Sequence, residues 1–250
     1  MCGQIFKCTD DAVARCALLI KSGEILVFPT DTIYGIGCDP YNDRAVERIF
    51  AIKGRDEKKP LPVLAYSTAD AEKIVSLGDA GRVLAKKYWP GVLTIKKISR
   101  RVTAAGSSLA VRVPANECVL SLLKRCKYLV GTSANPSGDS PRKSAQEVLN
   151  SSLKGYDALL DGGPVEKGIE STIVDITGSP KVLREGTIKA NEVMQLLGQV
   201  EPYSFHVQIQ GRRGAGRNPG SARHVWRSRR RIRNYRDQGP PACADRARSV

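Results

Sequence analysis

Histidine is missing from the first 203 residues of this 250-residue chain, because its two histidines, His206 and His224, both lie further on. Without histidine, that part of the chain cannot build a Ser-His-Asp or Cys-His nucleophile arrangement. A histidine-ligated zinc site is excluded there for the same reason. Any enzyme formed by residues 1–203 must therefore rely on other groups.

Cysteine is present, but without a metal-binding spacing. Six cysteines are scattered through residues 1–203 with no C-x-x-C pair, which gives little support for a zinc or iron–sulfur site. Scattered cysteines in a lysine-rich chain indicate a reducing compartment. The amino terminus has no apolar signal core, and no apolar run approaches the roughly 20 residues that cross a bilayer. The sequence therefore predicts a soluble, cytoplasmic protein without a membrane partner.

Acidic residues and lysine are scarce towards the carboxyl terminus. Residues 204–250 contain twelve Arg, two Asp and neither Lys nor Glu, a net charge of +10, whereas residues 1–203 carry only +5. The last segment is also rich in Gly and Pro and poor in aliphatic residues, so it cannot bury a core of its own. We predict a catalytic domain over 1–203. For 204–250 the alternatives are a disordered tail, an RNA-binding arm and the product of a shifted reading frame.

Short apolar runs and helical patterns alternate through the predicted domain. The runs that indicate strands cover residues 24–28, 61–65, 92–98, 109–113, 128–131, 158–160, 172–176 and 182–183. Helical spacing is found at 42–54, 80–88, 119–123, 144–149 and 191–197, the first of these between a cap at Asn42 or Asp43 and Gly54. The spacing is too irregular for a simple doubly wound sheet. It predicts an α/β fold with a twisted mixed sheet, flanking helices and a concave face.

Two polar tripeptides stand next to apolar runs, where a sheet protein presents its chemistry. Lys53-Gly54-Arg55 offers two cations, and Ser133-Ala134-Asn135 offers a hydroxyl and an amide suited to phosphate or carboxylate oxygens. Each also has a structural alternative, a solvated helix end for the first and a cap or turn for the second. Arg112, placed among apolar residues of a strand, predicts either a bound anion or an internal carboxylate partner.

Five segments occur together in one order. They are FPTDTIYGIG at 28–37, KGRDEKKPLPVLA at 53–65, SSLAVRVP at 107–114, GTSANPSG at 131–138, and GIESTIVD at 168–175 followed by VLREG at 182–186. Over roughly residues 10–200 the chain thus resembles the YrdC/Sua5 family, the L-threonylcarbamoyladenylate synthases. The resemblance implies a YrdC-like fold and a reaction that joins L-threonine, bicarbonate and ATP into threonylcarbamoyl-AMP, with release of pyrophosphate and water. The product serves threonylcarbamoyladenosine formation at position 37 of tRNA.

The resemblance also implies roles for single residues. It gives catalytic and ATP-binding roles to Lys53, Arg55, Ser133 and Asn135, further ATP contacts to Lys59, Ser108 and Arg184, and L-threonine contacts to Thr32, Arg112, Gly131 and Ser171. Magnesium is expected with the ATP, held mainly by phosphates and water rather than by protein side chains. Expected partners beyond the substrates are a separate threonylcarbamoyl transferase complex and tRNA or double-stranded RNA.

The chain departs from the family pattern at two places. Leu64 stands where some members have a threonine-contacting histidine, and many archaeal and eukaryotic members carry a second carboxyl-terminal domain that residues 204–250 do not resemble. A related carbamoyl-adenylate chemistry in hydrogenase maturation would require a zinc-finger cysteine array, which this sequence lacks. The alternative from another class is a non-catalytic module that binds tRNA or double-stranded RNA with steep salt dependence.

Overall fold

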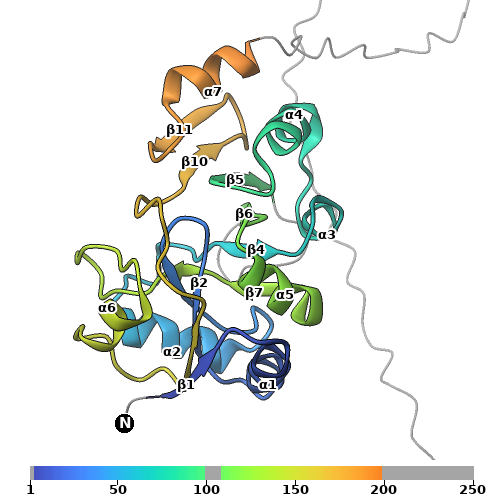
Figure 1. Ribbon diagram of the computed structural model, residues 1–250. Helices are drawn as coiled ribbons and strands as arrows, with labels where there is room; N and C mark the ends of the chain where they lie inside the picture. Colours follow the sequence, from blue (N-terminus) through green and yellow to red (C-terminus); the bar gives the residue numbers. More distant parts are fainter. Residues whose placement is uncertain (1–2, 99–107, 199–250) are drawn as a thin grey trace, which may run out of the picture. The chain divides into compact units, whose positions relative to one another are not determined.

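The computed structural model describes residues 3–98 and 108–198, and these residues form a mixed α/β fold with two sheets where the sequence predicted one (Figure 1). The segment 204–250 lies outside the described residues, so the predictions for it remain predictions. Among the helices of the described residues, none combines the length and apolarity required to cross a membrane.

The first sheet is five-stranded, and its inner strands are buried on both faces. Its order is β1 (Gln4–Lys7), β9 (Ala158–Asp161), β2 (Leu26–Pro29), β3 (Tyr34–Gly37), β8 (Thr132–Ser133). The strands β1, β9 and β2 are parallel, and β3 and β8 continue the sheet antiparallel. Val27 packs with α2 (Asp43–Lys53) and α6 (Ala145–Leu149), whereas Leu26 and Phe28 pack with α1 (Asp10–Lys21) and α5 (Glu117–Cys126). Burial on both faces explains why residues 25–28 of this segment are all apolar.

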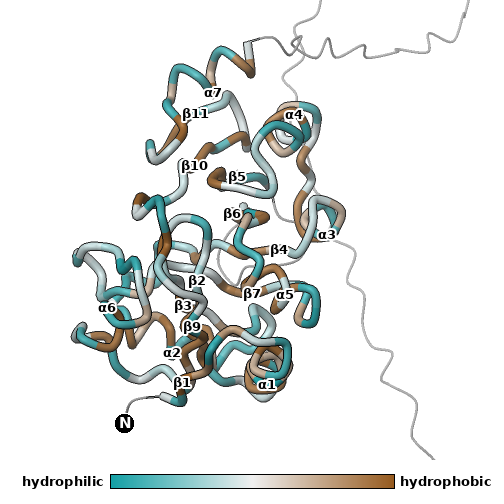
Figure 2. The backbone as a smooth tube through the Cα atoms, in the orientation of Figure 1, coloured by the Kyte–Doolittle hydropathy of each residue, from teal (hydrophilic) through white to brown (hydrophobic). Residues whose placement is uncertain are grey.

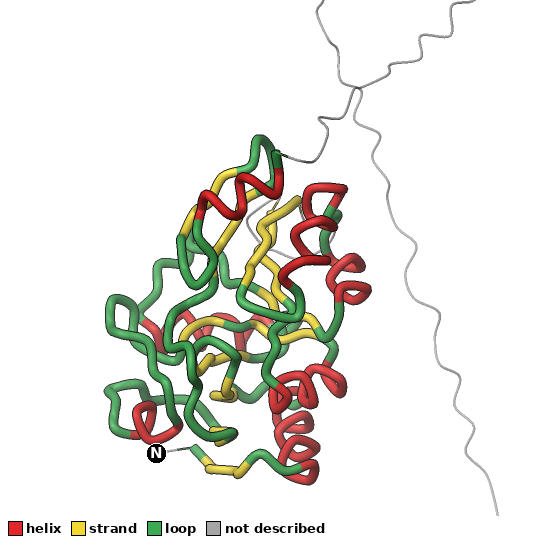
Figure 3. Tube along the Cα trace, turned by 45° about the horizontal axis from the view of Figure 1, so that its top comes forward, coloured by secondary structure: helices red, strands yellow, loops and turns green. Residues whose placement is uncertain are grey.

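The second sheet is six-stranded and buries one face under helices. Its order is β11 (Lys181–Arg184), β10 (Thr172–Asp175), β5 (Leu93–Ile98), β6 (Ser108–Arg112), β4 (Val63–Ala65), β7 (Tyr128–Val130). The covering helices are α3 (Thr68–Ile74), α4 (Gly78–Tyr88) and α7 (Ala190–Leu197). Apolar and polar residues alternate around α4 and α7 in Figure 2, as expected of helices with one buried side. Several helices form a row along one side of the strands in Figure 3.

The other face of the second sheet carries the polar residues. Leu109 and Val111 of β6 belong to the core under the helices, so Ala110 and Arg112 point to the opposite face, since side chains alternate along a strand. On β5, Leu93 and Ile95 are likewise in the core, and Thr94 points away from it. This face is the concave face that the sequence predicted.

The ends of α2 agree with the sequence signals. The Asn42 side chain accepts a hydrogen bond from the Ala45 N–H at 3.1 Å, and Gly54 closes the helix with a left-handed φ of 55°. A glycine takes this conformation without the steric strain that a Cβ brings. Lys53 is therefore the last residue of α2, and Arg55 begins the loop that leads to β4.

One disulfide differs from the expectation of reduced cysteines. Cys8, just before α1, is bonded to Cys118 in the first turn of α5, with Cα atoms 6.1 Å apart. The two residues are 110 positions apart, so only the packing of α1 against α5 brings them together. The cytoplasmic location remains a prediction. Cys38 is fully buried, and burial raises the pKa of its thiol to about 12, which agrees with a packing role and not with a nucleophile.

Candidate functional site

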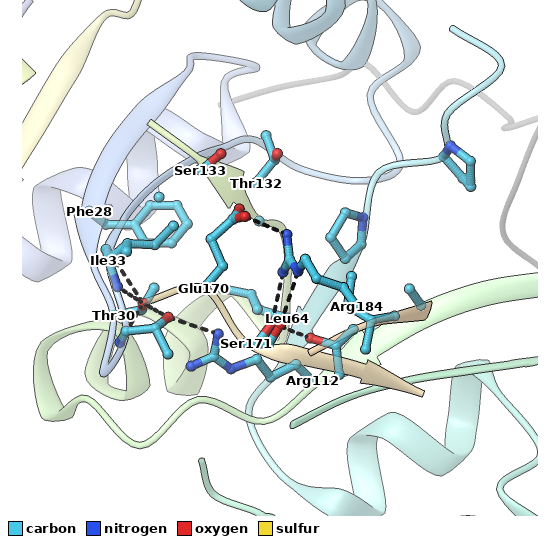
Figure 4. A pocket seen from close by; sticks show the side chains of 18 of the residues that line it. Phe28, Thr30, Ile33, Leu64, Arg112, Thr132, Ser133, Glu170, Ser171 and Arg184 are labelled. Atoms are coloured by element: carbon cyan, nitrogen blue, oxygen red, sulfur yellow. Dashed lines mark hydrogen bonds and ion pairs between the residues drawn. The ribbon is translucent and has the colours of Figure 1, made fainter. Parts of the chain in front are cut away.

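A cavity of about 150 Å³ lies where the β2–β3 turn and β8 of the first sheet face the polar side of the second sheet (Figure 4). Seven of the eleven predicted site residues line it: Thr32, Arg55, Arg112, Gly131, Ser133, Ser171 and Arg184. The structure therefore brings together residues that are up to about 150 positions apart in the sequence. Whether each has the role that the resemblance implies stays a prediction.

Arg112 is the most enclosed cation of the cavity. Its side chain is 7% exposed and forms a 2.6 Å ion pair with the Oδ1 atom of Asp31. Its Nε donates to the Gly91 carbonyl at 2.7 Å, and its Nη1 donates to the Thr32 hydroxyl at 3.0 Å. Of the two alternatives that the sequence left open for Arg112, the internal carboxylate partner is present in Asp31. Arg112 also lines the cavity, so it remains accessible to a bound anion. With five N–H groups, the guanidinium keeps donors for a ligand beyond these three bonds.

Hydroxyl groups surround this arginine. The Thr32 hydroxyl lies 2.9 Å from that of Thr30, and the Ser171 hydroxyl lies 2.9 Å from that of Thr94. Arg184 donates to the backbone carbonyl of Ser171 at 3.1 Å and to its hydroxyl at 3.3 Å. Figure 4 shows Arg112 and Ser171 on one side of the cavity, with Arg184 reaching towards Glu170. Hydroxyls that both donate and accept suit a small polar ligand with groups of both kinds.

Lys53 does not line the cavity but lies immediately behind it. Lys53 is only 3% exposed. Its ammonium group donates hydrogen bonds to the backbone carbonyls of Ser133 and Asn135, and the bond to Asn135 is 2.6 Å long. The Ser137 N–H in turn donates to the Lys53 carbonyl at 2.8 Å. Lys53 thereby ties the end of α2 to the loop that follows β8. It also holds in place the end of β8, where Ser133 lines the cavity.

Asn135 is also buried behind the cavity wall. Its Nδ2 donates to the carbonyls of Pro136 and Asp139 at 2.9 and 2.8 Å, while its Oδ1 has no partner among the described residues. An amide that bonds to the backbone of its own loop is a turn-stabilising group. The structure therefore places Asn135 in the turn that the sequence analysis considered as its alternative, although the unpartnered oxygen leaves it one acceptor.

Two further predicted residues lie outside the cavity. Lys59 is exposed, and its backbone carbonyl accepts a hydrogen bond from Arg55 Nε at 3.1 Å. Ser108 begins β6 four residues before Arg112, on the same face of the sheet. At about 3.3 Å per residue, it is roughly 13 Å along the strand from Arg112. Ser108 could therefore reach only a ligand that extends well beyond the cavity, whereas Lys59 precedes Pro60, which lines it.

The sequence analysis did not select four polar residues that line the cavity, Thr30, Thr94, Thr132 and Glu170. Thr94 had a readable signal, because it interrupts an apolar strand between Leu93 and Ile95 in the way Arg112 interrupts β6. Glu170 was one of several acids with no spacing to distinguish it. Leu64 also lines the cavity and packs against Gly131, where an added Cβ would lie 2.5 Å from the leucine side chain.

The charge of Lys53 gives a testable dependence of stability on pH. Burial, and next the charge of Arg55, lower the pKa of the ammonium to about 8, below its ordinary value near 10.5. Between pH 8 and 10.5 the unfolded chain therefore binds more protons at this residue than the folded chain, so the folded state gains stability as pH rises. Urea unfolding measures the unfolding free energies of the wild type and of Lys53→Met. Between pH 8 and 10.5, the value for the wild type should rise relative to the value for the variant. A difference independent of pH would contradict the lowered pKa.

Among residues 3–98 and 108–198, no three His, Cys, Asp or Glu side chains are grouped closely enough to hold a metal ion. The cavity instead combines three arginines, one carboxylate and several hydroxyls. It contains neither histidine nor cysteine, so its groups are suited to binding and neutralising anions rather than to covalent catalysis.

Comparison with known proteins gives a consistent result. A family model for Sua5, YciO and YrdC, described as "Telomere recombination", matches residues 18–186. A threonylcarbamoyl-AMP synthase of Pyrococcus abyssi is 32% identical over 201 residues, 77% of this chain and 58% of that protein. A putative threonylcarbamoyl-AMP synthase of Mycobacterium tuberculosis is 32% identical over 207 residues, 78% of this chain and 95% of that protein. The chain thus spans little more than half of the archaeal relative and nearly all of the mycobacterial one.

Solved structures agree with these relatives. A P. abyssi Sua5 complexed with L-threonine superimposes with a TM-score of 0.72 at 29% identity, covering 80% of this chain and 61% of that one. An Escherichia coli YciO gives a TM-score of 0.70 over 76% of this chain and 99% of that one, and at 20% identity it supports the fold alone.

Proposed function

Because the chain belongs to the YrdC/Sua5 family, we propose that it is a threonylcarbamoyl-AMP synthase, a nucleotidyltransferase that makes the activated intermediate for threonylcarbamoyladenosine in tRNA. The observation that carries the proposal is one cavity in which a buried arginine, two further arginines and six hydroxyl side chains converge, with neither histidine nor cysteine among the described residues that line it. Relatives that carry this name support the enzyme over the alternative of a non-catalytic RNA-binding module.

L-Threonine fits the enclosed end of the cavity. Its carboxylate would bind Arg112, as planar guanidinium groups bind carboxylates well. The hydroxyls of Thr32, Thr94 and Ser171 lie around this arginine and can bond the amino and hydroxyl groups of the substrate. The cavity is smaller than the roughly 300–1,000 Å³ of pockets that enclose drug-sized ligands, so a nucleotide would extend beyond it.

The chemistry of the proposed reaction requires alignment and charge neutralisation. The threonine amine attacks bicarbonate to form a carbamate and water, and a carbamate oxygen then attacks the α-phosphorus of ATP while pyrophosphate leaves. No protein atom forms a covalent bond in either step. In the proposed reaction, Arg55 and Arg184 of the cavity lining neutralise the phosphates, and Ser133 of the same lining has its carbonyl bonded to Lys53.

Magnesium is proposed to accompany the ATP. A metal carried by a triphosphate needs few protein ligands, which agrees with a cavity that has hydroxyls and one carboxylate rather than a cluster of acids. When bound, it would supply further neutralisation of phosphate charge. Ser133, whose hydroxyl group lines the cavity, is the residue that would contact such an ion. A transferase complex that uses the product, and tRNA itself, remain expected partners.

The test is pyrophosphate release by the full chain supplied with ATP, bicarbonate, Mg²⁺ and L-threonine. Release should require all three substrates, and mass spectrometry should detect threonylcarbamoyl-AMP. Omitting threonine, or replacing it with L-valine, should reduce the rate to background. Folded protein that releases no pyrophosphate, yet binds RNA with steep salt dependence, would contradict the enzyme and support the binding module.

A further inference from the structure

Glu170 is the only acidic residue among the described residues that line the cavity. The other charged lining residues are Arg55, Arg112 and Arg184, and ATP, bicarbonate and pyrophosphate all carry net negative charge. A carboxylate in such a place opposes the binding of every one of these ligands, since like charges a few ångströms apart repel. Its position therefore requires an explanation of its own.

The Glu170 carboxylate serves as the counter-ion of the cationic group. Its Oε2 lies 2.7 Å from Nη1 of Arg184, and Figure 4 shows its side chain extended across the cavity towards that guanidinium. The same negative charge acts to raise the pKa values of Lys53 and Arg55, against the burial that lowers both. One carboxylate thus partly neutralises three cations in the absence of a ligand.

The surroundings of Glu170 leave its side chain free to move while its backbone stays fixed. The chain before it is tied to the first sheet by a bond from the Gly168 N–H to the Thr32 carbonyl at 2.8 Å. The chain after it is tied to the second sheet by a bond from the Thr172 N–H to the Val92 carbonyl at 3.0 Å. The side chain itself is 33% exposed, and among residues 3–98 and 108–198 the ion pair with Arg184 is its one side-chain hydrogen bond or ion pair.

Arg184 would keep its place if the carboxylate left. Its Nε and Nη2 are bonded to Ser171, so the Glu170 contact uses only Nη1. Asp31 differs from Glu170 in this respect: its side chain is 10% exposed and its Oδ1 also accepts the Ala115 N–H at 3.0 Å. Asp31 is thus fixed beside Arg112, whereas Glu170 can exchange with a ligand.

We propose that Glu170 is an exchangeable internal anion: its carboxylate pairs with the phosphate-binding cations of the cavity, leaves when a polyphosphate binds, and returns to displace pyrophosphate. This inference rests on the proposed function for the identity of the product. In physical terms, an anion that binds to these cations must replace the Glu170 carboxylate, so one negative group is exchanged for another. The exchange lowers affinity for the triphosphate and in return prevents the product from remaining bound.

The test compares Glu170→Gln with Glu166→Gln, a matched control on the same connecting segment whose side chain is exposed and does not line the cavity. Calorimetric titration of the full chain with inorganic pyrophosphate, without Mg²⁺, should show about tenfold tighter binding for Glu170→Gln and no change for Glu166→Gln. In turnover, Glu170→Gln should lower both KM for ATP and kcat, because product release becomes slow. Unchanged or weaker pyrophosphate binding by Glu170→Gln would overturn the inference.

The two proposals can fail separately. Threonine-dependent turnover with unchanged pyrophosphate affinity in Glu170→Gln would leave the enzyme standing and remove the exchange. Tighter pyrophosphate binding by Glu170→Gln, without any threonine-dependent turnover of the wild type, would support the exchange and contradict the proposed enzyme. Thermal melting of both variants checks folding, and both should melt near the wild type because a partly exposed ion pair contributes little to stability.

Discussion

Replacing Arg112 by lysine is expected to raise KM for L-threonine by about 100-fold while leaving KM for ATP nearly unchanged. A lysine can still pair with Asp31, so no charge is left alone in the interior. It cannot reproduce the three differently directed bonds to Gly91, Thr32 and Asp31, nor offer a planar fork to a carboxylate. Steady-state kinetics with each substrate varied in turn would measure both constants.

Alanine at the same position would confuse binding with folding. It would leave the Asp31 carboxylate nine-tenths buried without its partner, which costs about 3–5 kcal/mol when one member of a buried pair is removed. Arg48→Lys is the matched control, since Arg48 is also ion-paired, with Asp157 and Glu24, but does not line the cavity. If Arg112→Lys keeps the wild-type KM for threonine, Arg112 does not hold the substrate carboxylate.

Lys53→Met and Arg55→Met are expected to reduce turnover by about 100-fold or more, for different physical reasons. Methionine at 53 leaves two buried carbonyls without their shared donor, a loss of about 2 kcal/mol and therefore roughly 4–8 °C in melting temperature. Arg55 is half-buried, and its bonds go to the carbonyls of Lys59 and Pro60 in its own loop. Its replacement should change the melting temperature by less than about 2 °C.

Measuring melting and turnover together separates the two roles. A Lys53→Met variant that melts like the wild type would show that the lysine does not support the loop after β8. Near-normal turnover in Arg55→Met would remove Arg55 from the proposed phosphate contacts. Lys58→Met is the control, because that side chain is exposed in the same loop, does not line the cavity and has no predicted role.

Local signals predicted many of the elements correctly. The run at 24–28 and the helix between Asn42 and Gly54 correspond to β2 and α2, because burial and capping are determined by neighbouring residues. The division into two sheets was not predictable in the same way. It depends on pairings such as Gln4 with Ala158, and no local pattern specifies which distant strand a short strand joins. The helices α1 and α3 were missed although their sequences carry capping residues, Thr9 and Ser67.

The sequence predicted many of the residues that line the cavity, but not the directions and contacts of their side chains. The ordered motifs predicted that Thr32, Arg112 and Ser171 belong to one site, and all three line the cavity, as expected of residues near strand ends. The direction of the Lys53 side chain could not be read from its motif, because it depends on the path of the loop after β8. Glu170 was not distinguishable from other acids until the fold placed it opposite Arg184.

The order in which the strands join has a consequence for the newly synthesised chain. Residues 4–37 supply three strands of the first sheet, but β9, which lies between β1 and β2, ends only at residue 161. Until then β2 has a free edge towards β9, and exposed strand edges promote association between chains. Such distant pairings also slow folding. During translation the chain must therefore carry an open apolar edge for more than a hundred residues, which makes this the stage at which aggregation or chaperone binding is expected.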